Sequence, residues 1–261
     1  MRKINILGKR IAIFVGILIF FLGNVGDLFA INFPEDFVLN NLPDYIKELK
    51  KSSVLILVGQ QKDVVGTGFL TLNKNHEIVV ITNKHVALLG PPLFVRVNGP
   101  TGTIDCFAKL YKTAKNYDLA LINLKSTFDN PTLDTVDQCI PESMFAGKND
   151  IMEGKEVVYI GYPLRLGVEE RNYPVSRQAL IAQVIPKKHT YLLDGTASHG
   201  NSGSPVFDRK TGKLIGMVES FNADFIDLFT EQRVLTARLP YNSGISKVVS
   251  SEVIKKFVYD F

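Results

Sequence analysis

Residues 196–207 (TASHGNSGSPVF) place Ser202 in a glycine-rich stretch. Glycines allow a tight turn, which would project the Ser202 hydroxyl outward and direct the amides of Gly200 and Ser202 toward one point. Two convergent amides can hold a carbonyl oxygen that becomes negative when a nucleophile attacks the carbonyl carbon. Gly, Asn, Ser and Pro also make ordinary surface turns, so the segment needs partners elsewhere in the chain to indicate chemistry.

A serine hydroxyl is a poor nucleophile unless a base removes its proton, so a histidine must lie near Ser202 in the fold. Of the four histidines, His85 directly follows the apolar run IVVIT, which would fix its imidazole at the end of a strand. His76 and His189 lie in polar turns, where a solvated role is the simplest. His199 is three positions from the serine, too close to reach back in line with the hydroxyl, and is expected at the rim of a pocket.

Such a base needs a buried carboxylate that fixes its tautomer and stabilises the imidazolium formed during the reaction. Asp118 stands immediately ahead of an apolar run in NYDLALINL, where burial would be costly without a cationic or hydrogen-bonding partner. Asp105, in TIDCF, is the competing candidate, but it lies inside a strand-like run and can face solvent by alternation. We favour Asp118.

Length and composition suit a packed globular chain. The 261 residues are 46% hydrophobic, enough for one two-lobed unit or two small domains. The 30 basic and 26 acidic side chains leave a charge of +4 that is spread along the chain, so nucleic acid is not an expected partner. Cys106 and Cys139 have no Cys or His at ligand spacing, so no metal site is expected, and buried packing and a single disulfide both remain open.

Residues 1–30 have the charge layout of an export signal. Residues 1–10 hold four cations, and residues 11–26 hold no charge. The uncharged run is shorter than the ~20 residues that cross a bilayer comfortably, which favours a removable signal peptide. Ala30 can end the signal, but Leu28 is larger than cleavage sites prefer, so a retained signal-anchor and membrane tether remains open. In either case the positive flank predicts a periplasmic or extracellular protein.

The pattern of the chain changes at residue 53. Residues 31–52 are expected to form a helical segment outside the main fold, with a short helix that begins or is interrupted near Pro43. Beyond them, short β-branched runs separated by turn residues indicate an all-β domain. The first six runs span 54–58, 66–72, 78–82, 93–97, 104–111 and 119–124. The second six span 157–162, 179–185, 191–194, 205–207, 214–219 and 234–240.

These runs predict two similar barrels, the first over residues 53–124 and the second over 157–242. The polar residues 125–156 between them read as a linker. Residues 243–261 are expected to form a C-terminal amphipathic helix, because five apolar residues fall near helical spacing: Val248, Val249, Val253, Ile254 and Phe257.

Four motifs in this order resemble those of the trypsin-like serine peptidases: GTGFL at Gly66, ITNKHV at Ile81, DLALI at Asp118 and GNSGSPVF at Gly200. Within that superfamily they are most similar to bacterial glutamyl-endopeptidase-like and Deg/HtrA-like members, over roughly residues 53–242. The resemblance implies a chymotrypsin-like fold of two six-stranded antiparallel β-barrels, with short N- and C-terminal helices. Too few residues follow the second barrel for a PDZ-type domain.

The resemblance also implies roles for the candidate residues. One barrel would supply His85 and Asp118, the other Ser202, and the amides of Gly200 and Ser202 would form the oxyanion hole. The expected activity is hydrolysis of a polypeptide substrate by a His-Asp-Ser triad through an acyl-enzyme, with no cofactor or metal. The sequence leaves the oligomeric state open.

Substrate specificity is less well defined by the sequence. By family geometry, the substrate-binding candidates are Thr196 at the base of the pocket, His199 at its rim, and Glu219 and Phe221 along its wall. Glu219 can attract a basic side chain if it faces the pocket, or can be a solvent-facing strand residue. Val218 occupies the position where glutamyl endopeptidases would carry an acid-recognising histidine, so glutamate specificity is not expected.

Two other functions remain open. A catalytically silent domain of the same fold would bind peptides or a partner protein in the cleft, although such members usually lose a triad residue and all three candidates are present here. An esterase would use the same acyl chemistry, but the Gly-x-Ser-x-Gly turn of many esterases is not formed around Ser202.

Overall fold

The computed structural model describes residues 42–99, 102–124, 136–166, 173–229 and 235–260. The proposed signal over residues 1–30, and most of the proposed N-terminal segment, lie outside the described residues. Among the described helices, none has the length and apolar character needed to cross a membrane.

The first six strands close into one antiparallel barrel, in the order β1-β2-β3-β6-β5-β4. Their β-branched and aliphatic side chains point into a continuous core, which also holds Cys106 and Cys139, both buried and not joined in a disulfide. The strands are β1 (Ser53–Val58), β2 (Asp63–Leu72), β3 (Ile78–Thr82), β4 (Leu93–Gly99), β5 (Gly102–Thr113) and β6 (Ala120–Leu124).

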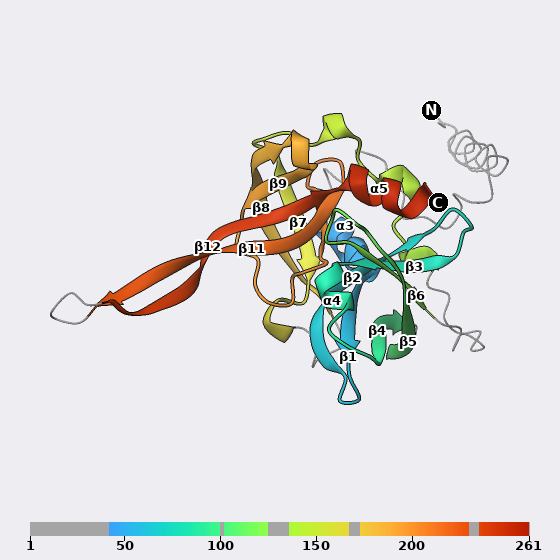
Figure 1. The fold of residues 1–261 in the computed structure, drawn as a ribbon. Coiled ribbons are helices and arrows are strands. Elements are labelled where there is room, and N and C mark those ends of the chain that lie inside the picture. Colours follow the sequence, from blue (N-terminus) through green and yellow to red (C-terminus); the bar gives the residue numbers. More distant parts are fainter. Residues whose placement is uncertain (1–41, 100–101, 125–135, 167–172, 230–234, 261) are drawn as a thin grey trace, which may run out of the picture.

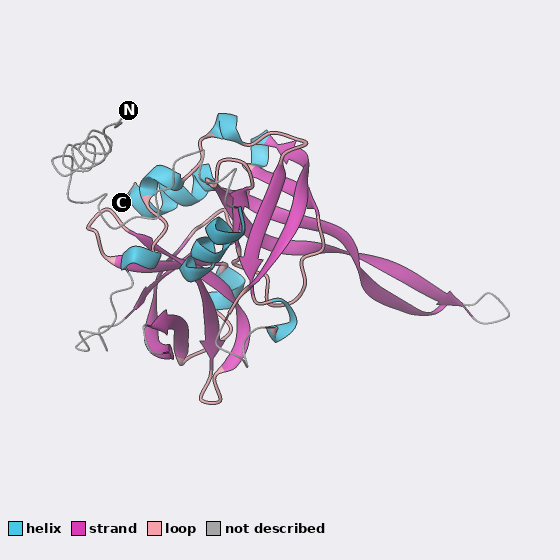
Figure 2. Cartoon of the chain, turned by 180° about the vertical axis from the view of Figure 1, so that it is seen from behind, coloured by secondary structure: helices cyan, strands magenta, loops and turns pink. Residues whose placement is uncertain are grey.

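The last six strands close into a second antiparallel barrel, in the order β10-β11-β12-β9-β8-β7. The predicted fold class, two six-stranded antiparallel barrels with terminal helices, is confirmed (Figures 1 and 2). The strands are β7 (Glu156–Gly161), β8 (Val175–Ile185), β9 (Thr190–Asp194), β10 (Pro205–Asp208), β11 (Leu214–Phe229) and β12 (Leu235–Ser250). Short 3-10 turns occur at Lys50–Ser52, Val136–Gln138, Glu142–Met144, Lys148–Asp150, Pro163–Arg165 and Pro186–Lys188.

β11 and β12 are far longer than the sequence indicated. Beyond the barrel they continue as a two-stranded ribbon that projects from the molecule (Figure 1). Large apolar side chains on the ribbon are about half exposed, such as Phe225 and Leu239. The C-terminal helix was predicted from residue 243, but residues 243–250 belong to β12, and α5 spans only Ser251–Tyr259. The apolar spacing that suggested a helix combines two adjacent strand residues, Val248 and Val249, which are buried in different clusters on opposite faces of β12, with the apolar residues of a short helix.

The N-terminal helix α3 (Leu42–Leu49) packs into the main fold, so the expectation that it lies outside is wrong. Tyr45 and Leu49 are one helical turn apart and both are fully buried in the cluster between the barrels. The Tyr45 hydroxyl donates to the carbonyl of Gly212, 2.6 Å away. The helix therefore covers the junction of the two barrels, and α5 contributes Phe257 to the same cluster.

Candidate active site

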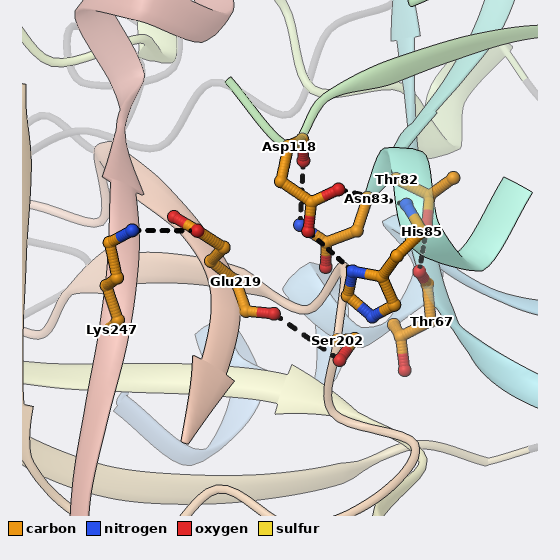
Figure 3. Close-up of polar contacts among 8 residues, drawn as sticks. All are labelled: Thr67, Thr82, Asn83, His85, Asp118, Ser202, Glu219 and Lys247. Atoms are coloured by element: carbon orange, nitrogen blue, oxygen red, sulfur yellow. Dashed lines mark hydrogen bonds and ion pairs between the residues drawn. The ribbon is translucent and has the colours of Figure 1, made fainter. Parts of the chain in front are cut away.

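Two segments of the first barrel and one of the second bring His85, Asp118 and Ser202 together (Figure 3). His85 lies on the one-turn helix α4 (Lys84–Ala87), directly after β3. Asp118 lies two residues before β6, the strand paired with β3, so the two side chains emerge at the same end of adjacent strands. Ser202 lies in the turn between β9 and β10.

His85 and Asp118 are joined by two hydrogen bonds. The ring Nδ1 is 2.5 Å from Asp118 Oδ2, and the backbone amide of His85 donates to Asp118 Oδ1 at 2.9 Å. The buried side chain of Asn83 donates to the Asp118 carbonyl at 2.9 Å, which fixes the backbone that carries the carboxylate. The imidazole is half exposed, whereas the carboxylate is 23% exposed.

These contacts determine the charges of the pair. The hydrogen bond to Asp118 raises the pKa of His85 above 6.5, against the opposing effect of burial, and the negative charges of Asp118 and Glu219 add to it. Burial of Asp118 disfavours its ionised form, but the hydrogen bonds from the His85 ring and from the His85 and Lys84 amides hold its pKa below 3.8. An ionised carboxylate beside Nδ1 keeps a proton on that atom and leaves Nε2 as the acceptor.

The Ser202 hydroxyl lies on the side of the imidazole away from Asp118 (Figure 3). Its Oγ is 3.5 Å from the backbone carbonyl of Glu219, a distance at the limit of a hydrogen bond. The hydroxyl is therefore held only weakly by the protein, and Ser202 is partly exposed. This arrangement suits a group that must turn toward a base and a substrate.

The turn around Ser202 leaves two amides unpaired. The carbonyl of His199 accepts from the amide of Leu164 at 2.7 Å, and because a trans peptide directs its C=O and N–H oppositely, the Gly200 amide points away from that contact. The Asn201 carbonyl is likewise bound to the amide of Ser204 at 2.9 Å. Within the described chain the amides of Gly200 and Ser202 donate to no protein group. Both are available to a ligand oxygen.

The conformation of Gly200 requires glycine. Its φ is +92°, in the region that side chains disfavour, and a Cβ here would lie 2.2 Å from the carbonyl oxygen of Tyr162. Because the obstacle is backbone, no side-chain movement relieves it.

Glu219 is neither a free pocket charge nor a solvent-facing strand residue, the two possibilities that the sequence left open. It is the extra residue of a β-bulge, since Val218 pairs with Val248 and Ser220 pairs with Lys247. Its carboxylate is 17% exposed and accepts from the Lys247 ammonium at 2.8 Å, while its carbonyl faces Ser202 (Figure 3). A basic side chain of a substrate would therefore meet an ion pair here and not a lone carboxylate.

The other proposed specificity residues lie around the same turn. His199 is exposed, and its ring meets that of Phe221 edge-to-face with centroids 5.5 Å apart. Thr196 is exposed, and its carbonyl accepts from the Tyr159 hydroxyl at 2.8 Å. The contacts with substrate proposed for His199 at the rim, Thr196 at the base and Phe221 along the wall of a pocket remain predictions.

Asp105, the competing carboxylate, lies elsewhere. It accepts two hydrogen bonds from Arg96, at 2.5 and 2.9 Å, and one from Lys62 at 2.8 Å, and it makes no contact with His85 among the described residues. His76 and His189 both occupy left-handed turn positions, as expected for turn residues. In the described part of the chain, no three His, Cys, Asp or Glu side chains are grouped closely enough to hold a metal ion.

Three residues at the site were not singled out from the sequence: Thr67, Asn83 and Lys247. Thr67 and Asn83 lie inside the motifs GTGFL and ITNKHV, whose spacing located the site but gave no side-chain role to either residue. Lys247 lies in the segment that the sequence assigned to a helix, so its position beside Glu219 could not be foreseen.

Residues 66–217 match the family model of the trypsin-like peptidase domain, which is more than half of the chain. The chain belongs to the trypsin-like peptidase family. Comparison with curated protein sequences gave no match.

Solved structures of the same fold include the MamO protease domain of Magnetospirillum magneticum in its apo form. It is 18% identical with a TM-score of 0.57, and the alignment covers 81% of this chain and 98% of that one. A serine endoprotease from Yersinia pestis is 17% identical with a TM-score of 0.57, covering 87% of this chain and 65% of that one. At such identities the likeness shows the fold of this trypsin-like peptidase and nothing finer.

Proposed function

We propose that this trypsin-like peptidase is an active serine endopeptidase that cleaves polypeptides through an acyl-enzyme. The observation that carries the proposal is the placing of one imidazole between an ionised carboxylate, 2.5 Å from Nδ1, and the hydroxyl of Ser202. Asp118 holds the ring in the tautomer that leaves Nε2 free to accept the hydroxyl proton.

The reaction runs in two halves. Ser202 Oγ bonds to the peptide carbonyl carbon while its proton passes to Nε2 of His85, and the carbonyl oxygen becomes an anion between the amides of Gly200 and Ser202. The C–N bond then breaks as the imidazolium returns the proton to the leaving amine. Water attacks the resulting ester by the same route, which releases the acid and restores the serine.

The cell compartment is part of the proposal. Residues 1–26 have a basic flank followed by an uncharged apolar run, and this pattern supports an exported chain whose polypeptide substrate lies outside the cytoplasm. Whether the run is removed or serves as a tether is decided by the mass of the mature N-terminal peptide.

A peptide library tests the activity without knowledge of the cleavage site. The full-length chain is incubated with peptides from a digested cell extract, and mass spectrometry identifies new termini. We expect new termini with wild type and with Ser204→Ala, whose buried hydroxyl in the same turn has no partner among the described residues. Ser202→Ala and His85→Ala should produce none. Equal cleavage by Ser202→Ala, or none by a folded wild-type protein, would refute the proposal, and the second result would favour the silent binding domain.

A further inference from the structure

The oxyanion turn belongs to the second barrel, but it is held by a side chain of the first. Thr67 on β2 is fully buried, and its backbone amide donates to the carbonyl of Ser202 at 2.9 Å. Its hydroxyl Oγ1 is 2.6 Å from the carbonyl of Gly200 and 3.1 Å from the amide of Tyr162. One residue of the first barrel thus binds three backbone groups of the second, two in the oxyanion turn and one at Tyr162.

The hydroxyl of Thr67 donates in one of these two contacts and accepts in the other. A hydroxyl has one proton to donate and accepts through its lone pairs. The Tyr162 amide can only donate and the Gly200 carbonyl can only accept. Oγ1 therefore accepts from the Tyr162 amide and donates its proton to the Gly200 carbonyl. The carbonyl of Thr67 in turn accepts from the Thr82 hydroxyl at 2.6 Å (Figure 3), which fixes the backbone of the residue.

Gly200 needs such external contacts because glycine has little conformational preference of its own. The peptide before it is fixed by the bond between the His199 carbonyl and the Leu164 amide, 2.7 Å long. The peptide after it is fixed by Thr67 Oγ1. The Gly200 amide belongs to the first of these peptides and the Ser202 amide follows the second. Both contacts are therefore needed to keep the two amides directed at one position.

We infer that Thr67 is a positioning residue, whose hydroxyl fixes the backbone between the Gly200 and Ser202 amides and so keeps both directed at the oxyanion. This inference rests on the proposed peptidase activity and adds a cross-barrel dependence to it: the oxyanion site of the second barrel is complete only when the first barrel is docked. Thr67 touches no reacting atom and acts through Gly200.

The test compares three threonine variants of the full-length chain. Thr67→Val keeps the shape of the side chain and removes both hydrogen bonds, whereas Thr67→Ser keeps both. The matched control is Thr71→Val on the same strand, where an equally buried hydroxyl donates to the Ile140 carbonyl at 2.8 Å, away from the turn. For each variant a fluorophosphonate probe gives the maximal rate of Ser202 phosphonylation and, separately, the probe concentration at half-maximal rate.

We expect Thr67→Val to lower the maximal rate by about 10- to 100-fold, less than the ~10²–10³-fold loss on removing an oxyanion donor outright, with the half-saturating concentration little changed. Thr67→Ser should restore most of the rate, and Thr71→Val should keep it. A wild-type rate in Thr67→Val would overturn the inference alone, as would an equal loss in Thr67→Ser or Thr71→Val. Absence of labelling in folded wild type would overturn the proposed function and the inference with it.

Discussion

Asp118→Asn should disable the base by reversing the tautomer of His85. The two His85 donors bind different oxygens of the carboxylate, the backbone amide Oδ1 at 2.9 Å and ring Nδ1 Oδ2 at 2.5 Å. The backbone amide can only donate, so the single oxygen of an asparagine must face it. The NH₂ group then faces Nδ1, which becomes an acceptor and leaves the ring proton on Nε2. In that tautomer Nε2 cannot take the proton of Ser202.

In other Ser-His-Asp triads this substitution lowers the reaction rate by about 10⁴-fold, which corresponds to about 5 kcal/mol in activation free energy. We expect a loss of this size in the rate of labelling here. The assay is the second-order rate of fluorophosphonate labelling at Ser202 across a range of pH. Wild type should rise through the pKa of His85, which Asp118 holds above 6.5, because only the neutral imidazole is a base. Asp118→Asn removes the main cause of that shift, so any residual rise should move to lower pH.

The control is Asp105→Asn in the same barrel. Asp105 is bound by Arg96 and Lys62, so the variant loses an ion pair of comparable geometry without contact to His85. Its labelling rate should match wild type. If Asp118→Asn labels within about tenfold of wild type, or if Asp105→Asn loses as much, the assigned tautomer and the role of Asp118 are both refuted.

Two further predictions follow from the geometry. Glu219→Gln should move the acidic limb of the labelling profile to lower pH, because the charge of Glu219 helps to raise the pKa of His85. The control is Glu252→Gln, whose carboxylate lies beside His189 and not His85, and it should leave the limb in place. An unmoved limb in Glu219→Gln would contradict the electrostatic effect of Glu219 on His85. Replacing residues 224–241 by Asn-Gly should change Tm by less than about 4 °C, since an isolated ribbon contributes little stability and its side chains, such as Phe225, are half exposed. A larger fall in differential scanning calorimetry would show that the ribbon supports the barrel.

The barrels could be predicted because their strands have a local signature. Runs such as residues 78–82 are β-branched, short and bounded by turn residues. Each strand can therefore be recognised from its own residues, without knowledge of the strand with which it pairs. His85 and Asp118 could be predicted for the same reason, since each adjoins such a run.

The length of β11 and β12 could not be predicted, because the ribbon is held by pairing between its own two strands and its residues alternate irregularly between polar and apolar. Gly244 and its neighbours resemble a turn in sequence, yet they lie inside β12. The burial of Tyr45 was also hidden, since an amphipathic helix shows which face is apolar and not what covers it.

The contacts that hold the site were hidden by sequence distance. Thr67 and Gly200 are separated by 133 positions, and Glu219 and Lys247 meet only because a bulge shifts their register. A motif identifies a residue by its type and its position. The hydrogen bonds that its side chain makes depend on which backbone segment the fold places beside it.

The most direct measurement is the site of covalent modification by a fluorophosphonate in the folded, full-length chain, read by mass spectrometry of the labelled peptide. We expect a single label on Ser202, formed with loss of fluoride, that disappears in Ser202→Ala and in His85→Ala. A label on another serine, or a label at Ser202 that forms equally fast in His85→Ala, would contradict an assembled nucleophile and base.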